Sequence, residues 1–265
     1  MAPPPDGDAR IAPALLLTTA LLSGCKTTTA PSHEPVSVAA AADLSDAFAE
    51  LGRVFEARSG QKVVLSFGAS GALAKQLGQG APFDLFAAAN SSFVDEAVNA
   101  GACDASTKAL YARGHLVVWT RANGPQIQKL TDLKGAAIQR VSIANPDHAP
   151  YGKAAREALT RAGIWSAVEG KIVPAENVRQ ALQFAETGNV DVAIVALSLV
   201  STKKDGQRLA IDPALHAPIN QTLVVCRHGK NAEGGRAFAA LVESPEGQKL
   251  LERYGFGGSA EQPGK

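Results

Sequence analysis

Four loops in this sequence place small residues at the start of a predicted helix. They are Ala39–Asp43, Gly68–Gly71, Pro150–Gly152 and Ala175–Val178. A helix N-terminus offers unpaired backbone N–H donors and roughly half a positive charge, so it can bind an anion without a cationic side chain. Small residues let the backbone approach such a ligand closely. Any one loop is more simply an ordinary strand–helix turn, but several that converge on one cleft would form a site for a desolvated oxyanion.

A catalytic function is the main alternative, and the sequence supports it weakly. The segment Gly68–Ala72 has the outline of a hydrolase nucleophile elbow around Ser70, but Ala72 stands where that motif requires its last glycine. A triad would also need an acid that orients a histidine, which the sequence does not place. No cluster of histidines, cysteines and carboxylates has metal-ligand spacing, so no bare-cation site is expected. We therefore expect neither enzymatic activity nor a cofactor, and a purely structural protein is the third class to consider.

The elements that position these loops alternate between strands and helices. Apolar residues recur at helical spacing between Leu44 and Phe55, and similar periods mark the later helices. Short apolar runs predict strands at Val36–Ala40, Val63–Phe67, Asp84–Ala88, His115–Thr120, Val141–Ala144, Lys171–Val173, Val190–Val195 and Thr222–Cys226. This alternation predicts an α/β protein with mostly parallel, buried sheets. It permits two lobes that hold a ligand between strand C-termini and helix N-termini.

The composition is that of an ordinary globular protein. The chain has 265 residues, of which 46% are hydrophobic and 19% charged, and its formal net charge is +1. This length allows two domains of modest size, each with its own core. Near-neutral charge and an aromatic content of 5% argue against the basic and stacking surfaces that a nucleic-acid partner requires. Cys103 and Cys226 could form a disulfide in an exported protein or remain free thiols.

The N-terminal segment has the pattern of an export signal. The apolar run Ile11–Leu22 is too short to span a bilayer, which needs about 20 residues. Leu22-Ser23-Gly24-Cys25 follows it and resembles the lipobox of bacterial lipoproteins, in which the cysteine is acylated. We therefore predict a signal peptide at residues 1–24, lipidation at Cys25 and a polar tether over residues 25–35. An ordinary signal peptide with a chance cysteine is the alternative.

Six segments extend over nearly the whole mature chain: Val36–Leu44, Ser66–Gly71, Gly80–Phe86, Asn145–Gly152, Pro174–Arg179 and Arg253–Phe256. In this order, they resemble the family of periplasmic molybdate-binding proteins. The resemblance implies a type II periplasmic-binding-protein fold, in which a double crossover joins two lobes, and it implies no catalysis. On this fold we place lobe I at residues 36–112 and 222–265 and lobe II at residues 113–221.

The same resemblance implies the ligand and the residues that contact it. The family's contact positions fall here on Asp43, Ser70, Tyr151, Val178 and Ala196. The family uses backbone N–H groups at several of these positions, so changes of side chain are tolerated there. The implied ligand is molybdate or tungstate, with molybdenum bound as the oxyanion. The implied protein is a monomer on the periplasmic side of the cell envelope that delivers the anion to an ABC permease and its ATPase.

Two of these positions depart from the family pattern. Better-known members have serine at the position of Asp43 and tyrosine at that of Ala196, so two hydroxyl donors are missing here. A carboxylate beside a dianion is costly, because two unit charges 4 Å apart repel by about 4 kcal/mol at an effective dielectric constant of 20. We expect Asp43 to turn away and cap its own helix, leaving only its amide at the ligand. In the alternative, Asp43 accepts a proton from a protonated oxyanion such as phosphate or a phosphonate.

Overall fold

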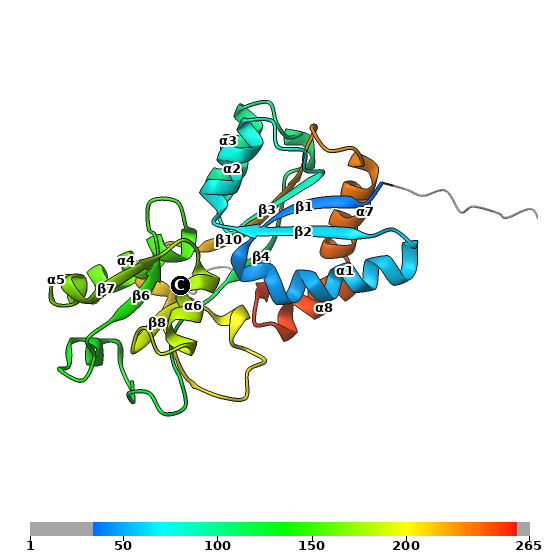
Figure 1. The fold of residues 1–265 in the computed structure, drawn as a ribbon. Helices are drawn as coiled ribbons and strands as arrows, with labels where there is room; N and C mark the ends of the chain where they lie inside the picture. The colour runs from blue at the N-terminus through cyan, green and yellow to red at the C-terminus, as the bar shows by residue number, and fades with distance from the viewer. Residues whose placement is uncertain (1–33, 259–265) are drawn as a thin grey trace, which may run out of the picture. The chain divides into compact units, whose positions relative to one another are not determined.

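The computed structural model describes residues 34–258 of the chain. The predicted signal peptide, the predicted lipidation site Cys25 and all but the last two residues of the tether lie outside the described residues. Two β-sheets with flanking helices make up residues 34–258 (Figure 1). Across that same range, none of the helices has the length and apolar character needed to cross a membrane.

The first sheet has six strands in the order β11-β4-β10-β3-β1-β2. They span Val36–Ala41 (β1), Val63–Gly68 (β2), Leu85–Ala88 (β3), Ala109–Gly114 (β4), Ile219–Val225 (β10) and Gly257–Gly258 (β11). Successive residues of a strand point to opposite faces, and in β1 both Val38 and Ala39 are fully buried. The continuous apolar run of β3 fits a strand that is covered on both faces.

Helices cover both faces of the first sheet (Figure 1). They are α1 (Ser45–Ser59), α2 (Ser70–Gly78), α3 (Ser91–Asn99), α7 (Ala232–Glu243) and α8 (Pro245–Arg253). Helices α2 and α3 pack on one face, and α1, α7 and α8 pack on the other. In α1, the predicted helical spacing places Phe48 and Phe55 in the core, where both rings pack edge-on against Phe238 of α7.

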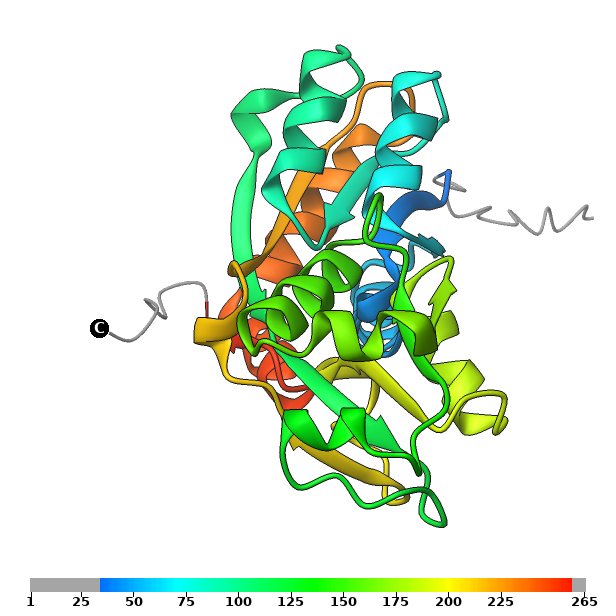
Figure 2. The same ribbon diagram turned by 90° about the vertical axis from the view of Figure 1, so that its left-hand side faces the viewer.

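The second sheet has five strands in the order β7-β6-β8-β5-β9. They span Leu116–Thr120 (β5), Val141–Ala144 (β6), Ile172–Ala175 (β7), Val192–Ala196 (β8) and Gln207–Ala210 (β9). Its helices are α4 (Pro150–Arg161), α5 (Trp165–Val168) and α6 (Val178–Glu186), shown in green and yellow-green in Figure 2. Helices α4 and α6 pack against β6 and β8. Short 3₁₀ helices span Ala42–Leu44 (η1), Ala105–Thr107 (η2), Leu130–Lys134 (η3), Glu169–Lys171 (η4), Leu197–Leu199 (η5) and Pro213–Leu215 (η6).

The chain passes between the two sheets twice. It leaves the first sheet at Gly114, where β4 ends, and enters the second at Leu116, where β5 begins. It returns between Ala210 of β9 and Ile219 of β10. These passages form the double crossover expected of the fold. The lobe boundaries placed from the sequence fall inside β4 and β10, a few residues from the crossings.

Both sheets are mixed, which corrects the expectation of mostly parallel sheets. Strand β1 is parallel to β2 and β3, and β6 is parallel to β7 and β8. Beside the crossings the direction reverses, because β10 is antiparallel to β3 and β4, and β5 is antiparallel to β8 and β9. The path of the chain between the sheets sets these directions, and apolar patterning carries no information about that path.

Cys103 and Cys226 form a disulfide, which answers the question that the sequence left open. The two residues face each other in an antiparallel bridge beside the first sheet, and both are buried. Backbone hydrogen bonds of 2.8 Å on either side, from Asp104 N to Val225 O and from Arg227 N to Ala102 O, hold the two segments together. The disulfide therefore joins segments that lie 123 residues apart in the sequence.

Candidate functional site

All four loops singled out in the sequence contribute to one small pocket of about 200 Å³, a volume that includes solvent at its mouth. The lining residues are Ala41, Ala42, Asp43, Gly68, Ala69, Ser70, Ala89, Ala149, Pro150, Tyr151, Asn177 and Val178. The pocket thus lies at the N-terminal ends of η1, α2, α4 and α6. Its lining contains no lysine or arginine, so any positive potential there comes from the helix ends.

The first turns of η1, α2 and α4 have no side-chain caps. The residues that precede them are Ala41, Ala69 and Ala149, and alanine has no oxygen to accept a bond from a first-turn amide. Since the first N–H groups of a helix have no partner within the helix, these amides need an acceptor from elsewhere. Oxygen atoms of a bound anion would be suitable acceptors.

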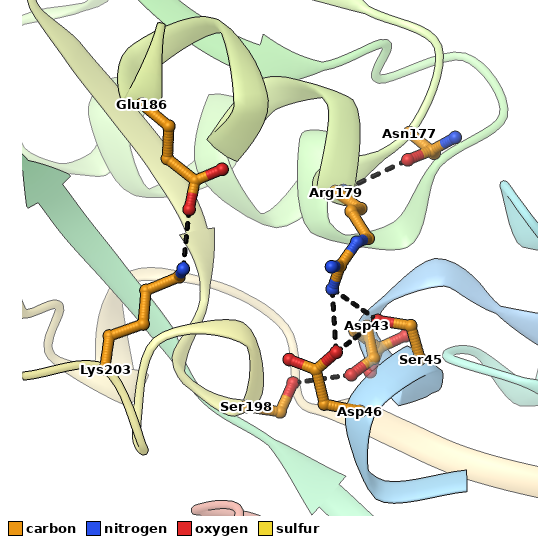
Figure 3. A network of polar contacts seen from close by, with 8 residues as sticks. All are labelled: Asp43, Ser45, Asp46, Asn177, Arg179, Glu186, Ser198 and Lys203. Carbon is orange, nitrogen blue, oxygen red and sulfur yellow. Dashed lines mark hydrogen bonds and ion pairs between the residues drawn. The ribbon is translucent and has the colours of Figure 1, made fainter. Parts of the chain in front are cut away.

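Helix α6 is capped in a way that leaves its first amide available. The side chain of Asn177 accepts a hydrogen bond of 3.0 Å from Arg179 N (Figure 3). It also accepts one of 3.1 Å from Gln180 N. These two bonds do not involve the backbone N–H of Val178, the first residue of the helix. Val178 lines the pocket. The backbone N–H of Val178 can therefore serve a ligand, whatever its side chain does.

The side-chain hydroxyl of Ser70 can donate a hydrogen bond to a ligand in the pocket. It is 1% exposed, and its Oγ accepts a hydrogen bond of 3.1 Å from the backbone N–H of Ala89. That bond fixes the position of the oxygen and uses one of its lone pairs, so the hydroxyl proton is still available to donate. Ser70 therefore offers a ligand both a side-chain donor and the amide of the first residue of α2.

Tyr151 and Ala196 differ in how they relate to the pocket. Tyr151 lines it, but its hydroxyl lies 3.4 Å from Gln221 Nε2 and so close to the Cα of Gly114 that no β-carbon would fit there. Its side chain is thus directed toward the crossover strands, which leaves its backbone for a ligand. Ala196, at the end of β8, is fully buried and is absent from the lining. The structure brings together four of the five residues carried over from the family.

The prediction that Asp43 caps its own helix was wrong. Neither η1, in which Asp43 lies, nor α1, which follows, receives a side-chain capping bond. Instead, Asp43 Oδ2 accepts a hydrogen bond of 2.6 Å from Gln221 Nε2, a residue of β10. Gln221 is fully buried in β10, so its amide finds a partner only in the interior. The carboxyl group is therefore held among buried polar side chains next to the pocket.

Burial has a large effect on the acidity of this carboxyl group. Loss of hydration raises the pKa of Asp43 to about 7, although the neighbouring Tyr151 hydroxyl and Gln221 amide lower it in part. The pKa values of Tyr151 and Tyr111 are both raised well above the ordinary value, first by burial and then by the charge of Asp43. Burial thus brings the pKa of a carboxyl group at the pocket close to neutral pH.

Arg179 of α6 connects the second sheet's elements to those of the first. Its Nη1 donates to Asp46 Oδ1 at 2.9 Å and to Ser45 Oγ at 2.8 Å, both in the first turn of α1 (Figure 3). The side chains of Arg179 and Asp46 are 51% and 36% exposed. An exposed pair of this kind contributes at most about 1 kcal/mol.

Two further bonds cross the pocket region. The backbone N–H of Gly71 donates to the carbonyl oxygen of His148 at 3.0 Å. The hydroxyl of Ser198, in η5, donates to the carbonyl oxygen of Asp43 at 2.8 Å (Figure 3). Together with Arg179, these bonds hold the helix N-termini of both lobes close around the pocket, as a closed conformation requires.

Gln221, Ser198 and Arg179 were not predicted from the sequence. Gln221 stands between Asn220 and Thr222, just before the predicted strand Thr222–Cys226, so no local pattern marks it as a buried polar partner. Ser198 and Arg179 carry no signal either, because serine and arginine are common on helix surfaces. Among residues 34–258, no group of three or more histidine, cysteine, aspartate or glutamate residues could hold a metal ion.

This fold and this pocket define an extracytoplasmic solute-binding protein. Residues 36–257 match the family model of bacterial extracellular solute-binding proteins, and the chain belongs to that family. It is 33% identical to the molybdate-binding protein ModA of Rhodobacter capsulatus over 221 residues, which covers 83% of this chain and 87% of that protein. It is 34% identical to ModA of Azotobacter vinelandii over 227 residues, with coverage of 84% and 89%.

A solved structure extends this likeness to three dimensions. The periplasmic molybdate-binding protein of Azotobacter vinelandii superimposes with a TM-score of 0.78 at 26% identity. The match covers 83% of this chain and 98% of that one. These relatives are solute-binding proteins and not enzymes.

Proposed function

We propose that this protein binds molybdate, and also tungstate, outside the cytoplasm and delivers it to an ABC importer. The observation that carries the proposal is the pocket at which the N-termini of η1, α2, α4 and α6 meet without a cationic side chain. Such a site suits a fully deprotonated tetrahedral oxyanion, because each oxygen accepts bonds from fixed N–H donors. The similarity to molybdate-binding relatives over most of the chain supports the choice of anion.

The contacts we propose come from both lobes. Asp43 and Ser70 lie in helices that flank the first sheet, while Tyr151 and Val178 lie in the first turns of helices that flank the second. The amides of all four residues, together with the Ser70 hydroxyl, would surround the anion. We leave Ala196 out, because it does not line the pocket.

Selectivity gives the first test of this proposal. In calorimetric titrations, molybdate and tungstate should bind tightly with one-to-one stoichiometry, and sulfate should bind at least about tenfold more weakly, a difference of 1.4 kcal/mol. Sulfate is smaller, so donors set for the larger anions would make longer and poorer bonds to it. Sulfate that bound as tightly as molybdate in a competition titration would contradict the proposal, as would tighter binding of phosphate.

Ser70→Ala should weaken molybdate binding by about 1.5–3 kcal/mol, the usual loss for one hydrogen bond to a charged group. This corresponds to roughly a 10- to 150-fold increase in Kd. Ser59→Ala is a suitable control, since that hydroxyl bonds to Phe55 O at the far end of α1 and takes no part in the pocket. A change in Kd of less than twofold for Ser70→Ala would show that this hydroxyl does not bind the ligand.

The membrane partners and the anchor follow from the same proposal. A solute-binding protein of an importer would dock on a permease that is driven by an ATPase. A lipid on Cys25 would keep it at the membrane surface, and the tether over residues 25–35 would give the domain reach. The anchor stays a prediction from the sequence motif Leu22–Cys25.

A further inference from the structure

Asp43 supplies the acidic side chain of a pocket that otherwise suits an anion. The other lining residues are small, apolar or neutral amides, apart from Ser70 and Tyr151. Asp43 is 1% exposed, and its Oδ1 is a buried oxygen with no hydrogen-bond partner among residues 34–258. A charged carboxylate in this position would face the negative charge of a bound oxyanion with one oxygen unsatisfied.

The groups that face Asp43 do not neutralise it. Gln221 of β10 bonds to Oδ2, and the hydroxyls of Tyr111 in β4 and Tyr151 in α4 lie 3.4 Å from the same glutamine. The Tyr151 hydroxyl and the Gln221 amide both lower the pKa of Asp43 in part, but both groups are neutral. In the adjoining helices, Arg179 of α6 pairs with Asp46 of α1 and also donates a hydrogen bond to the hydroxyl of Ser45. In η5, Ser198 bonds to the backbone of Asp43 and not to its carboxyl group. Within the described part of the chain, no cation therefore balances the carboxylate.

We propose that the protein binds its oxyanion with Asp43 protonated, so that binding of a dianion takes up one proton. In the neutral form, the side chain keeps an oxygen to accept from Gln221 Nε2 and gains an O–H donor on the otherwise unpartnered Oδ1. The repulsion between carboxylate and ligand is then removed. This inference rests on the proposed function, since it assumes that the ligand is a dianion such as molybdate.

The expected pH dependence follows from the free protein. Burial already places the pKa of Asp43 near 7 in the absence of ligand, and a nearby dianion raises it further, because like charges disfavour the ionised form. Below about pH 7 the carboxyl group is protonated before the ligand arrives, so affinity should not change with pH. Above pH 7 a proton must be taken up, and Kd should rise about tenfold for each further pH unit.

The experiment measures molybdate and tungstate binding by calorimetry between pH 6 and pH 9. The wild type should lose about 100-fold in affinity over this range and should take up close to one proton per ligand at pH 8, as judged from buffers of different ionisation enthalpy. Asp43→Asn has the same shape but carries no charge, so its affinity should be independent of pH and its proton uptake zero. Asp95→Asn, which removes an exposed carboxylate of α3 that pairs with Lys108, should keep the wild-type profile.

Two results would overturn the inference. They are wild-type affinities at pH 6 and pH 9 that agree within twofold, or binding at pH 8 without proton uptake. Asp43→Ser gives a second neutral variant. Even when neither variant folds, proton uptake by the wild type still tests whether binding protonates the protein. By contrast, a wild type that binds neither molybdate nor tungstate at pH 6 would contradict the proposed function itself.

Discussion

Gly71→Ala should weaken molybdate binding by about 30- to 1000-fold while both lobes remain folded. A β-carbon on Gly71 would lie 2.8 Å from Phe93 Cε1 and 2.9 Å from the carbonyl oxygen of His148. Phe93 belongs to the same lobe and can shift, but His148 O is backbone of the other lobe and accepts the Gly71 N–H bond. The added methyl group therefore keeps the backbone of one lobe from approaching that of the other.

The magnitude follows from two contributions. Overpacking of this kind costs about 1–3 kcal/mol, and the lost hydrogen bond adds about 1 kcal/mol. The clash with His148 O and the lost hydrogen bond occur only in the closed form, because they lie between the lobes, whereas Phe93 must shift in either form. The loss therefore appears mainly in affinity. A population that shifts toward the open form binds correspondingly less ligand.

Titration calorimetry and small-angle scattering measure this effect together. Ligand should compact the wild type and should compact Gly71→Ala only at much higher concentration. Gly78→Ala, at the other end of α2, is the control, because its β-carbon would meet Ala100 Cβ at an ordinary 3.5 Å. A wild-type affinity in Gly71→Ala, or wild-type scattering that ligand does not change, would contradict the closure of the lobes around the pocket.

Loss of the Cys103–Cys226 disulfide should lower the free energy of unfolding by about 2–5 kcal/mol. The disulfide joins residues 123 positions apart, and a cross-link over such a long loop restricts the unfolded chain strongly. For a protein of this size, the change corresponds to a decrease in Tm of roughly 4–20 °C. Oxyanion affinity at 25 °C should stay unchanged, since neither cysteine lines the pocket.

Thermal unfolding of the double variant Cys103→Ser/Cys226→Ser gives the measurement. The wild type in a reducing agent is the matched control, because it loses the cross-link without a change of side chain. The two samples should unfold at similar temperatures, both below the oxidised wild type. Equal Tm values for oxidised and reduced wild type would show that the disulfide does not stabilise the domain.

Local patterns in the sequence were sufficient for the elements and the loops. The apolar spacing from Leu44 to Phe55 predicted α1, and the short apolar runs predicted eight strands close to their observed positions. The strands β4, β9 and β11 were missed, since their residues, ALYARG, QRLA and GG, do not form an apolar run. The four loops around the pocket were found because small residues before a helix are a local signal that needs no knowledge of the fold.

The tertiary structure decided everything that depends on residues far apart in the chain. Asp43 meets Gln221 across 178 residues and Ser198 across 155, and those contacts turned an expected helix cap into a buried carboxyl group with a raised pKa. The direction of β10 and the pairing of Cys103 with Cys226 likewise follow from the double crossover. The physical reason is the same in each case. Hydration, charge and bonding partners depend on which segments pack together, and no local pattern of residue types contains that information.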